Sequence, residues 1–318
     1  MSRMIVRIVQ QINAAQRVLV CAHASPDGDA IGSTLGLMLG LEKLGKEVVA
    51  YNVDGVPDIF RFLPGADRLV SNLSSQEDFD LVFVLDAGDL SRTGDLVAER
   101  APILINIDHH PGSDFGDICY LDTSAAATAV LILRVLKACG LPLDCNIALP
   151  LYTGLLSDTG SFRYANSNPE AFAVGGELVA LGIDPWEVAS ALYESQPSER
   201  MRLLSQVLTT LHISPDGKYA SVAMSLEMLK SSGALPEHTD GFVNYPRAIA
   251  GVEVAVFFRQ IDSETVKVGF RSRGNINVGR LANRLGGGGH KNAAGGEITG
   301  SLETVIPQVH ALLEKLLN

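Results

Sequence analysis

Residues 17–29 read RVLVCAHASPDGD, and this stretch decides how the rest of the chain is interpreted. Arg17–Ala22 is a short apolar run that predicts a fully buried strand. The next residues, 23–29, form a polar turn rich in Gly and Asp, and Ala30–Leu44 then predicts a helix that ends at Gly45. A strand, a polar turn and a helix in this order are typical of one unit of an α/β domain.

The same alternation continues through the first part of the chain. Further apolar strands are predicted at Glu47–Asn52, Asp80–Leu85 and Pro102–Ile107, and helices at residues 2–14, 146–154 and 169–181. Strands that alternate with helices favour a parallel sheet covered on both faces. We therefore expect the α/β fold class, with an N-terminal domain whose mainly parallel sheet is flanked by helices.

A second domain is expected after residue 200. The chain has 318 residues, a length typical of two domains, and the segment Tyr193–Arg200 is polar and broken by proline. Beyond it, strands are predicted at 212–214, 219–224, 252–260 and 265–271, and helices at 226–232, 278–285 and 302–317. We expect one domain over residues 1–190, a linker over 191–200, and a smaller α+β domain with largely hairpin-linked strands over 201–318, across a cleft from the first.

Charge is divided unevenly between these two parts. Residues 1–199 hold 12 Lys and Arg against 26 Asp and Glu, a net 12 − 26 = −14, whereas residues 200–318 hold 13 against 10, a net 13 − 10 = +3. The overall charge of −11 argues against a basic protein that coats duplex DNA. An acidic half joined to a mildly basic half indicates cations held by one and an anion bound by the other.

The cysteines and apolar segments bear on the compartment. Cys21, Cys119, Cys139 and Cys145 are widely spaced and form no C-x-x-C pair, which argues against a zinc ribbon or a disulfide scaffold. The most apolar helix candidate, Ala125–Leu136, is too short to span a bilayer, and the N-terminal stretch lacks the apolar core of an export signal. The sequence therefore predicts a cytoplasmic protein without a membrane partner.

The turn after the first strand carries three side chains that commonly bind metals, namely His23, Asp27 and Asp29. In open α/β sheets, ligands bind at the carboxyl ends of the strands. Gly28 lets the backbone follow a path that brings alternate residues to one side. Asp29 alone could instead be the N-cap of the following helix, but three ligand types together favour a metal site.

Further candidate ligands follow other buried segments. Asp86 follows residues 81–85, the run Asp108, His109 and His110 follows residues 103–107, and Asp158 follows buried, helix-like sequence. Each signal is weak alone, but five carboxylates and three imidazoles at one edge need cations to offset their repulsion. Ligation by oxygen and imidazole without thiolates indicates two divalent ions, manganese or magnesium, and paired ions of this kind hydrolyse phosphate esters.

The second domain contains a candidate anion site. The sequence LGGGGHKNAAGG from residue 285 includes Gly286–Gly289 followed by His290, and Arg271 and Arg273 lie at the end of a predicted strand. Glycine N–H groups approach anions closely, and guanidinium groups bind phosphate through two parallel hydrogen bonds. A glycine run is commonly a flexible turn and an arginine pair a solvated edge, but their combination favours phosphate binding.

In that order, HASPDGDAIGS, VLDAGD, DHH and SDTGSF resemble the four motifs of the DHH phosphoesterases, and FRSRGNINV with GGGGHKNAAGG resembles the DHH-associated C-terminal domain. The resemblance covers nearly the whole chain. The length is that of the short bacterial branch of bifunctional oligoribonucleases and PAP phosphatases, whereas RecJ-like exonucleases carry extra domains. Membrane-bound cyclic-dinucleotide phosphodiesterases carry transmembrane helices, and family-II pyrophosphatases lack the glycine-rich second domain.

The resemblance implies a role for each motif residue. One metal ion would be held by His23, Asp27 and Asp86, and the second by Asp29, Asp86, His109 and Asp158, so that Asp86 bridges the pair. Asp108 would hold its histidine neighbours in the right tautomer, and His110 would face the scissile phosphate. The substrate phosphate would be bound by Arg271, Ser272, Gly288, Gly289 and His290.

Residues and resemblance together predict a phosphoesterase with two divalent ions, most simply Mn²⁺. Its substrates would be short single-stranded RNA, degraded to nucleoside monophosphates, and adenosine 3′,5′-bisphosphate. Two alternatives stay open among enzymes: a RecJ-like single-strand exonuclease and a hydrolase of linear dinucleotides. A non-catalytic nucleotide-binding module is the alternative of another class, which the intact ligand set disfavours. The family also implies a homodimer.

Overall fold

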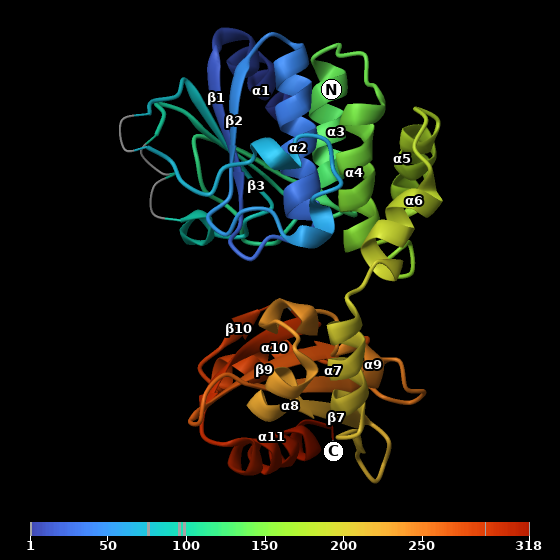
Figure 1. The fold of residues 1–318 in the computed structure, drawn as a ribbon. Coiled ribbons are helices and arrows are strands. Elements are labelled where there is room, and N and C mark those ends of the chain that lie inside the picture. The colour runs from blue at the N-terminus through green and yellow to red at the C-terminus, as the bar shows by residue number, and fades with distance from the viewer. Residues whose placement is uncertain (1, 75–76, 95–96, 98–99, 290, 318) are drawn as a thin grey trace. The chain divides into compact units, whose positions relative to one another are not determined.

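The computed structural model describes residues 2–74, 77–94, 97, 100–289 and 291–317. They divide into two compact units, Met1–Ser195 (unit 1) and Gln196–Asn318 (unit 2), which are drawn in Figure 1. The boundary between the units falls within the segment 191–200, where the sequence predicts a linker. Helix α7 (Ser198–Leu208) already begins inside that segment.

Unit 1 contains one parallel sheet. Its strands are β1 (Arg17–Ala22), β2 (Glu47–Tyr51), β3 (Leu81–Leu85), β4 (Leu104–Asp108) and β5 (Ile118–Leu121), in the order β2-β1-β3-β4-β5. Every neighbouring pair runs parallel. The predicted α/β class is therefore confirmed, with β5 as an additional strand.

The helices of unit 1 lie on one side of this sheet (Figure 1). They are α1 (Arg3–Ala14), α2 (Gly28–Lys43), α3 (Thr128–Ala138), α4 (Cys145–Asp158), α5 (Pro169–Val179) and α6 (Pro185–Ala189), followed by the π-helical turn η4 (Ser190–Glu194). Alternate strand residues such as Val20, Phe83 and Ile107 form one buried cluster with side chains of α1 to α5. Helices α2, α3 and α4 stand side by side in this layer, and α5 packs against α4 on the outside of it (Figure 1).

The opposite face of the sheet is covered by connecting segments. Leu19 and Val84, which alternate with residues of the first face, pack with Phe79 and Val97 from the segments before β3 and β4. The connections also contain short helical turns: η3 (Leu90–Thr93) packs on this face, whereas Phe60 of η1 (Asp58–Phe60) and Ala66 of η2 (Ala66–Arg68) belong to the buried cluster of the first face. The sheet is thus buried on both faces as expected, but long helices supply only one of the two layers.

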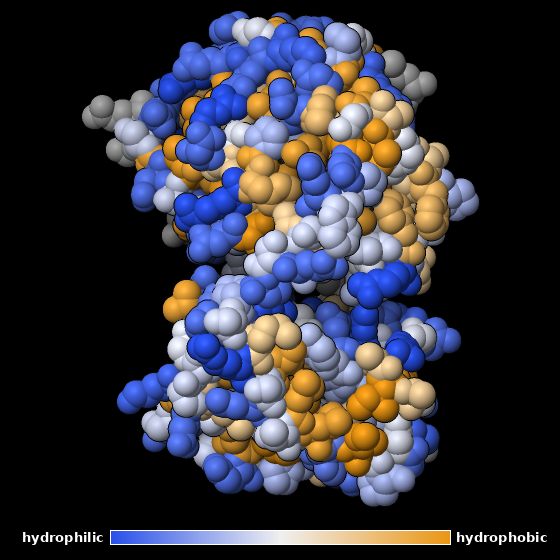
Figure 2. Space-filling view, turned by 45° about the vertical axis from the view of Figure 1, so that its right-hand side comes forward, coloured by the Kyte–Doolittle hydropathy of each residue, from blue (hydrophilic) through white to orange (hydrophobic). Residues whose placement is uncertain are grey.

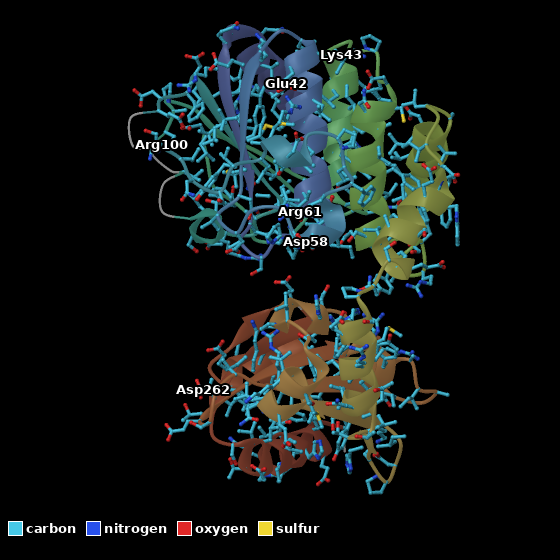
Figure 3. The ribbon with its side chains drawn as sticks, viewed as in Figure 1. Glu42, Lys43, Asp58, Arg61, Arg100 and Asp262 are labelled. Atoms are coloured by element: carbon cyan, nitrogen blue, oxygen red, sulfur yellow. The ribbon has the colours of Figure 1, made fainter. Side chains whose placement is uncertain are left out.

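Helix α2 runs along unit 1 from Gly28, just after the end of β1, to Lys43. Its last residues, Glu42 and Lys43, lie at the opposite end of unit 1 from Asp58 and Arg61 (Figure 3). Lys43 pairs with Asp144, just before α4, at 2.9 Å. An exposed ion pair of this kind contributes at most about 1 kcal/mol, so the helix layer is held mainly by its buried apolar side chains.

Unit 2 contains a mixed sheet in the order β10-β11-β9-β8-β7-β6. Its strands are β6 (His212–Ile213), β7 (Tyr219–Met224), β8 (Val254–Gln260), β9 (Thr265–Ser272), β10 (Gly288–Gly289) and β11 (Ala293–Thr299). Its helices after α7 are α8 (Leu226–Ser232), η5 (Pro236–Thr239), α9 (Asn244–Arg247), α10 (Val278–Arg284) and α11 (Leu302–Leu317). This is the α+β arrangement that the sequence predicts for the second domain.

One strand pair of unit 2 departs from the expected hairpin pattern. Strands β7 and β8 run parallel, because the chain crosses between them through α8, η5 and α9. The pairs β6–β7, β8–β9 and β10–β11 are antiparallel, as expected for hairpins. Val256 and Phe258 of β8 pack with α10 and α11, whereas Ala255 and Phe257 pack with α7 and neighbouring segments, so both faces of the sheet are covered.

The surface mixes hydrophilic and hydrophobic residues over the face shown in Figure 2. Phe172 on α5 is 57% exposed, but its ring stacks on that of Phe162, with 5.0 Å between the centroids. Within the described ranges, the structure contains no helix with the length and apolar character needed to cross a membrane.

Candidate functional site

The carboxyl ends of neighbouring strands bring the predicted site residues to one edge of the sheet in unit 1. Ala22 pairs with Leu85 in the register of β1 and β3, so the residues that follow them, His23 and Asp86, are neighbours. Asp108 ends β4, on the other side of β3. Strands β1 and β3 also flank the point where the strand order reverses, which is where open α/β sheets bind ligands.

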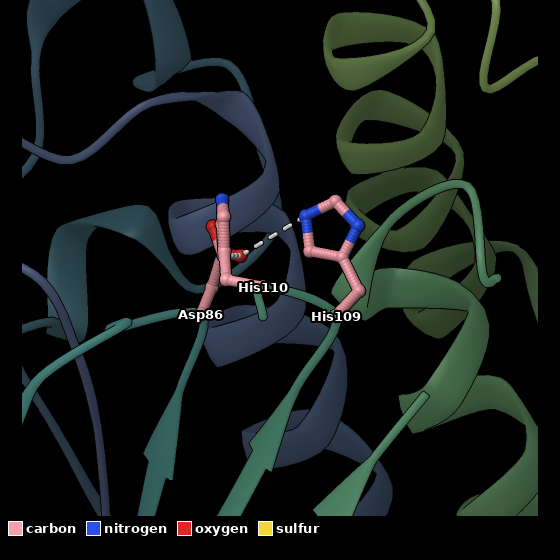
Figure 4. A group of neighbouring side chains, drawn as sticks. All are labelled: Asp86, His109 and His110. Carbon is pink, nitrogen blue, oxygen red and sulfur yellow. Dashed lines mark ion pairs between the residues drawn. The ribbon is translucent and has the colours of Figure 1, made fainter. Parts of the chain in front are cut away.

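Asp86 lies between two imidazoles. Its Oδ2 is 3.6 Å from Nε2 of His23, and its Oδ1 is 3.6 Å from Nε2 of His109. Figure 4 shows the second of these pairs together with His110. The backbone φ of Asp86 is +54°, in the left-handed region that Gly, Asn and Asp adopt most readily. Because each carboxylate oxygen faces a different histidine, Asp86 can serve two ligand groups at once.

The side chains predicted to bind metal, together with His110, gather into overlapping groups whose possible ligand atoms lie within 4.8 Å of one another. The groups are His23, Asp27 and Asp86; Asp29, His109 and Asp158; and Asp86, His109 and His110. Nε2 of His109 is buried and has no hydrogen-bond partner in the part of the chain that the structure describes, which is rare for a buried polar atom. It lies 3.6 Å from Asp86 and 3.7 Å from Asp158, as ligand atoms around a shared ion would. The residues present therefore fit divalent cations.

Asp27 and Asp29 each hold the start of a helix. The Asp27 carboxylate accepts the N–H groups of Asp29 and Ala30, both at 3.0 Å, and is the N-cap of α2. The Asp29 carboxylate accepts the N–H groups of Thr128, at 2.6 Å, and Ala129, at 2.9 Å, which begin α3. The alternative that Asp29 caps its own helix is therefore wrong, because α2 begins one residue before it.

Burial and repulsion between carboxylates control ionisation in the cluster. Burial alone would raise the pKa of Asp86, but hydrogen bonds with His110 and His23 outweigh it and hold the pKa of that carboxyl well below its usual range. Burial and the negative charge of Asp86 raise the pKa of Asp29. Burial also raises the pKa of Asp158 to about 7. Carboxylates that are costly to ionise are the groups that a divalent cation stabilises most.

Asp108 orients His110 but not His109. The Asp108 side chain is fully buried, and its Oδ1 lies 2.8 Å from Nδ1 of His110. Although burial opposes protonation, hydrogen bonds to Asp108 and to a second carboxylate raise the pKa of His110 to about 11. Nδ1 of His109 lies instead 3.3 Å from the carbonyl oxygen of Ala125. The tautomer contact predicted for Asp108 is thus made with only one of its two histidine neighbours.

Other polar contacts around the cluster come from residues that the motifs do not single out. Asn166 donates its side-chain N–H to Oδ2 of Asp158 at 3.1 Å. The guanidinium of Arg92 lies 3.2 Å from Nδ1 of His23. Arg92 follows the motif VLDAGD by a few residues, and Asn166 follows SDTGSF in the same way. Proximity to a motif is the one sequence feature that points to them.

The glycine run of unit 2 forms an ordered edge strand. Gly288 and Gly289 make up β10 and pair with Gly295 and Ala294 of β11. A Cβ atom on Gly287 would lie 2.2 Å from the carbonyl oxygen of Gly295, so the two segments approach too closely for any other residue type. Close backbone packing accounts for Gly287 and Gly289, whereas a Cβ on Gly286 or Gly288 would meet no atom nearer than 3.7 Å. The alternative of a flexible turn is wrong for Gly288 and Gly289, which form a strand.

The remaining predicted phosphate contacts lie at the end of β9, which pairs with β11. Arg271 is opposite Ala293 in this pairing. The Ser272 hydroxyl is buried and donates to the carbonyl oxygen of Ile276 at 2.7 Å, so it braces the turn after β9. Contact of Arg271 and Ser272 with a phosphate stays a prediction, and His290 lies outside the described residues.

Comparison with known proteins covers both units. A family model described as the DHH family, N-terminal domain, matches residues 17–155, and a DHHA1 domain model matches residues 217–318. The chain is 37% identical over 284 residues to the bifunctional oligoribonuclease and PAP phosphatase NrnA of Thermus thermophilus. The aligned region covers 89% of this chain and 84% of that protein. It is 28% identical over 297 residues to the protein of the same name from Bacillus subtilis, with 92% of each chain covered.

A solved structure agrees with the fold throughout. An exopolyphosphatase-related protein from Bacteroides fragilis superposes with a TM-score of 0.93 at 31% identity, covering 98% of this chain and 96% of that one. The fold and these relatives define a hydrolase that acts on phosphate esters. Within that class, the chain belongs to the DHH family, with a DHHA1 domain as its second unit.

Proposed function

We propose that this chain is a manganese-dependent phosphoesterase. It degrades short oligoribonucleotides to nucleoside monophosphates and removes the 3′-phosphate from adenosine 3′,5′-bisphosphate. The relatives from Thermus thermophilus and Bacillus subtilis are named as oligoribonucleases and PAP phosphatases. The observation that carries the proposal is the position of Asp86, whose two oxygens face different histidines at 3.6 Å each.

The proposal assigns two divalent ions to the acidic cluster. One ion would be held by His23, Asp27 and Asp86, and the other by Asp29, Asp86, His109 and Asp158. Oxygen and imidazole ligands without thiolates suit Mn²⁺ or Mg²⁺ better than a structural zinc site. When bound, a pair of such ions supplies a hydroxide nucleophile at neutral pH and offsets the charge that develops on the phosphate.

The chain's own residues would orient the substrate for this attack. His110, held through Nδ1 by Asp108, would donate a hydrogen bond to the scissile phosphate. Arg271 would bind a phosphate oxygen through its guanidinium group, and the N–H groups of Gly288 and Gly289 would approach the same anion. Attack would then come from the side opposite the departing sugar oxygen.

The test is digestion of a labelled series of oligoribonucleotides, from the dinucleotide upward, in parallel with adenosine 3′,5′-bisphosphate. With Mn²⁺ we expect mononucleotide release to be fastest for the shortest RNA, together with phosphate release from the bisphosphate. A chelator should abolish both reactions, because the ligand set has no activity without ions. No release of mononucleotide from a dinucleotide would contradict the proposal.

The same series separates the alternatives. Preference for long single strands would favour a RecJ-like exonuclease, and hydrolysis restricted to linear dinucleotides would favour a dinucleotide hydrolase. Nucleotide binding without turnover would indicate a non-catalytic module. Replacing Mn²⁺ by Mg²⁺ in the assay tests the identity of the metal, and we expect slower turnover with Mg²⁺.

A further inference from the structure

Thr128 contacts two carboxylates of the acidic cluster through two different groups. Its hydroxyl oxygen lies 3.0 Å from Oδ1 of Asp86, and its backbone N–H donates to Oδ2 of Asp29 at 2.6 Å. The residue is completely buried at the first position of α3. A single residue thus connects the carboxylate that faces both histidines with the carboxylate that belongs to the group of His109 and Asp158.

The direction of both hydrogen bonds is fixed by chemistry. An ionised carboxylate has only acceptors, so the Thr128 hydroxyl must donate to Asp86. The N–H group is available to Asp29 because the first N–H groups of a helix have no partner within it. Threonine is branched at Cβ and its side chain occupies few rotamers, so the position of the hydroxyl follows from the backbone of α3. The backbone of α3 therefore sets the position of both donors.

The oxygen that receives this hydroxyl is crowded with other ligand atoms. Oδ1 of Asp86 is also 3.6 Å from Nε2 of His109 and 3.3 Å from Nδ1 of His110. A hydroxyl that occupies one lone pair of Oδ1 turns the carboxylate so that the remaining lone pair faces the histidines. Loss of the hydroxyl would remove one of the contacts that oppose rotation of the carboxylate about its Cβ–Cγ bond, and would leave those with the histidines.

We propose that Thr128 is a positioning residue for the metal centre, which orients Asp86 and fixes its separation from Asp29. The inference rests on the pair of ions proposed above. Mutation of a residue that orients a metal ligand typically lowers metal affinity by about 10–100-fold. We therefore expect removal of the Thr128 hydroxyl to weaken Mn²⁺ binding to that extent, and a serine at this position to restore it.

The experiment compares Mn²⁺ affinity, measured by calorimetric titration of the full chain, among four variants. Thr128→Val keeps the shape of the side chain and removes the hydroxyl. Thr128→Ala removes the hydroxyl together with the methyl group, which avoids any steric conflict, and Thr128→Ser retains the donor. Thr34→Val is the matched control, because Thr34 is 1% exposed in the same helix layer. Its hydroxyl has no partner among the residues that the structure describes.

The expected result is affinity reduced by about 10–100-fold in Thr128→Val and Thr128→Ala, with Thr128→Ser and Thr34→Val close to the wild type. Thermal melting of the metal-free variants accompanies each titration. Wild-type affinity in Thr128→Ala would overturn the proposal, as would weak binding by Thr128→Ser or by Thr34→Val, since these would implicate packing instead of the hydroxyl. If the wild-type chain binds no Mn²⁺, the proposed metal centre itself is wrong. That result is distinct from a failure of the proposal for Thr128, in which the wild type binds Mn²⁺ and the variants bind it equally well.

Discussion

The carboxylate of Asp29 accepts the backbone N–H of Thr128 at 2.6 Å, although 99 residues separate the two in the chain. The residue before the helix, Ala127, has no side-chain group to cap α3, so Asp29 fulfils that role from α2. The positive end of the helix dipole lies at this point and attracts the carboxylate. Part of the negative charge in the cluster is thus balanced by the fold itself.

Replacement of Asp86 tests whether one carboxylate serves both ions. Asp86→Asn keeps the size of the side chain and tolerates the φ of +54°, whereas Asp86→Ala also strains the backbone. For both variants we expect loss of Mn²⁺ binding. Turnover of a dinucleotide should fall by about 10³-fold or more, because paired ions contribute several kcal/mol to transition-state stabilisation. Calorimetric titration and a turnover assay measure the two effects.

Asp89→Asn is the matched control for that experiment. Asp89 caps η3 by accepting the N–H of Ser91 at 2.8 Å, a bond that asparagine can also make, and it belongs to none of the ligand groups. This variant should bind Mn²⁺ and turn over like the wild type. Near-normal turnover in Asp86→Asn would exclude the bridging role.

Arg271→Ala tests phosphate binding by unit 2. We expect the KM for a dinucleotide to rise by about 10–100-fold, which corresponds to the loss of a hydrogen bond from a charged donor. Affinity for Mn²⁺ should not change, since Arg271 is not part of the acidic cluster. Steady-state kinetics and metal titration on the same preparation measure the KM and the affinity for Mn²⁺ separately.

Arg273→Ala serves as the control for Arg271. Arg273 is exposed and its guanidinium donates to the carbonyl oxygen of Arg247 at 2.7 Å. Its removal should change KM much less than removal of Arg271. Equal KM values for the wild type and Arg271→Ala would remove Arg271 from the phosphate site.

Gly287→Ala tests the close approach of the glycine run to β11. The added Cβ would lie 2.2 Å from the carbonyl oxygen of Gly295, so the strands must separate. We expect a loss of about 1–3 kcal/mol in the free energy of unfolding, as for other overpacked positions. Gly288→Ala is the control, because its Cβ would meet its nearest atom, Oδ1 of Asn283, at an ordinary 3.7 Å. In calorimetric melting of the full chain, the melting temperature of Gly288→Ala should be well above that of Gly287→Ala. The reverse order of melting temperatures would contradict this packing.

His310 predicts acid sensitivity in unit 2. Burial and the charge of His212, whose ring stacks on it at 4.6 Å, lower the pKa of His310 from 6.5 to about 4. The unfolded chain therefore takes up a proton first as the pH falls, so stability is complete above pH 6.5 and is lost progressively towards pH 4. Because His310 is only half-buried, we expect a loss of roughly 1–2 kcal/mol after screening by solvent.

The measurement is the melting temperature between pH 7.5 and 4.5 in the wild type and in His310→Gln. Glutamine can still accept the hydrogen bond that joins the ring to Ser221, at 2.9 Å in the wild type. The other titratable groups next to the ring, His212 on β6, Tyr219 on β7 and Glu314 on α11, remain in both proteins. The wild type should lose more stability on acidification than the variant, and identical pH profiles would show that His310 contributes nothing.

Strands β1 to β4 are predictable because each lies within a short apolar run, as in Leu81–Leu85, whose five residues are all buried. Strand β5 was not predicted: it has only four residues, and two of them are partly exposed. The edge strands β6 and β10 are only two residues long; the alternation at residues 212–214 predicts β6, whereas the glycines of β10 carry no periodic signal. The parallel pairing of β7 with β8 depends on the path of the chain through space. Helix α7 was predictable from the spacing of Leu203, Leu204 and Val207, but the polar residues around its start concealed it.

The metal ligands are predictable for a related reason. Each follows a strand, or ends a helix as Asp158 does, and the parallel sheet gathers strand ends at one edge. The contacts of Thr128 and Asn166 depend instead on how α3 and the segment after α4 pack against the cluster. No local pattern in the stretch SAAAT before α3 distinguishes Thr128 from other small residues near a helix start.

The two-residue length of β6 and β10 has a consequence for how copies of the protein meet. An open strand edge is a template on which a foreign strand can be added, and its strength grows with the number of backbone groups it offers. Both outer strands of the unit 2 sheet offer very few such groups. In concentrated solutions, the sheets of two copies should therefore not join edge to edge, even though the strands between these edges are longer and rich in apolar residues.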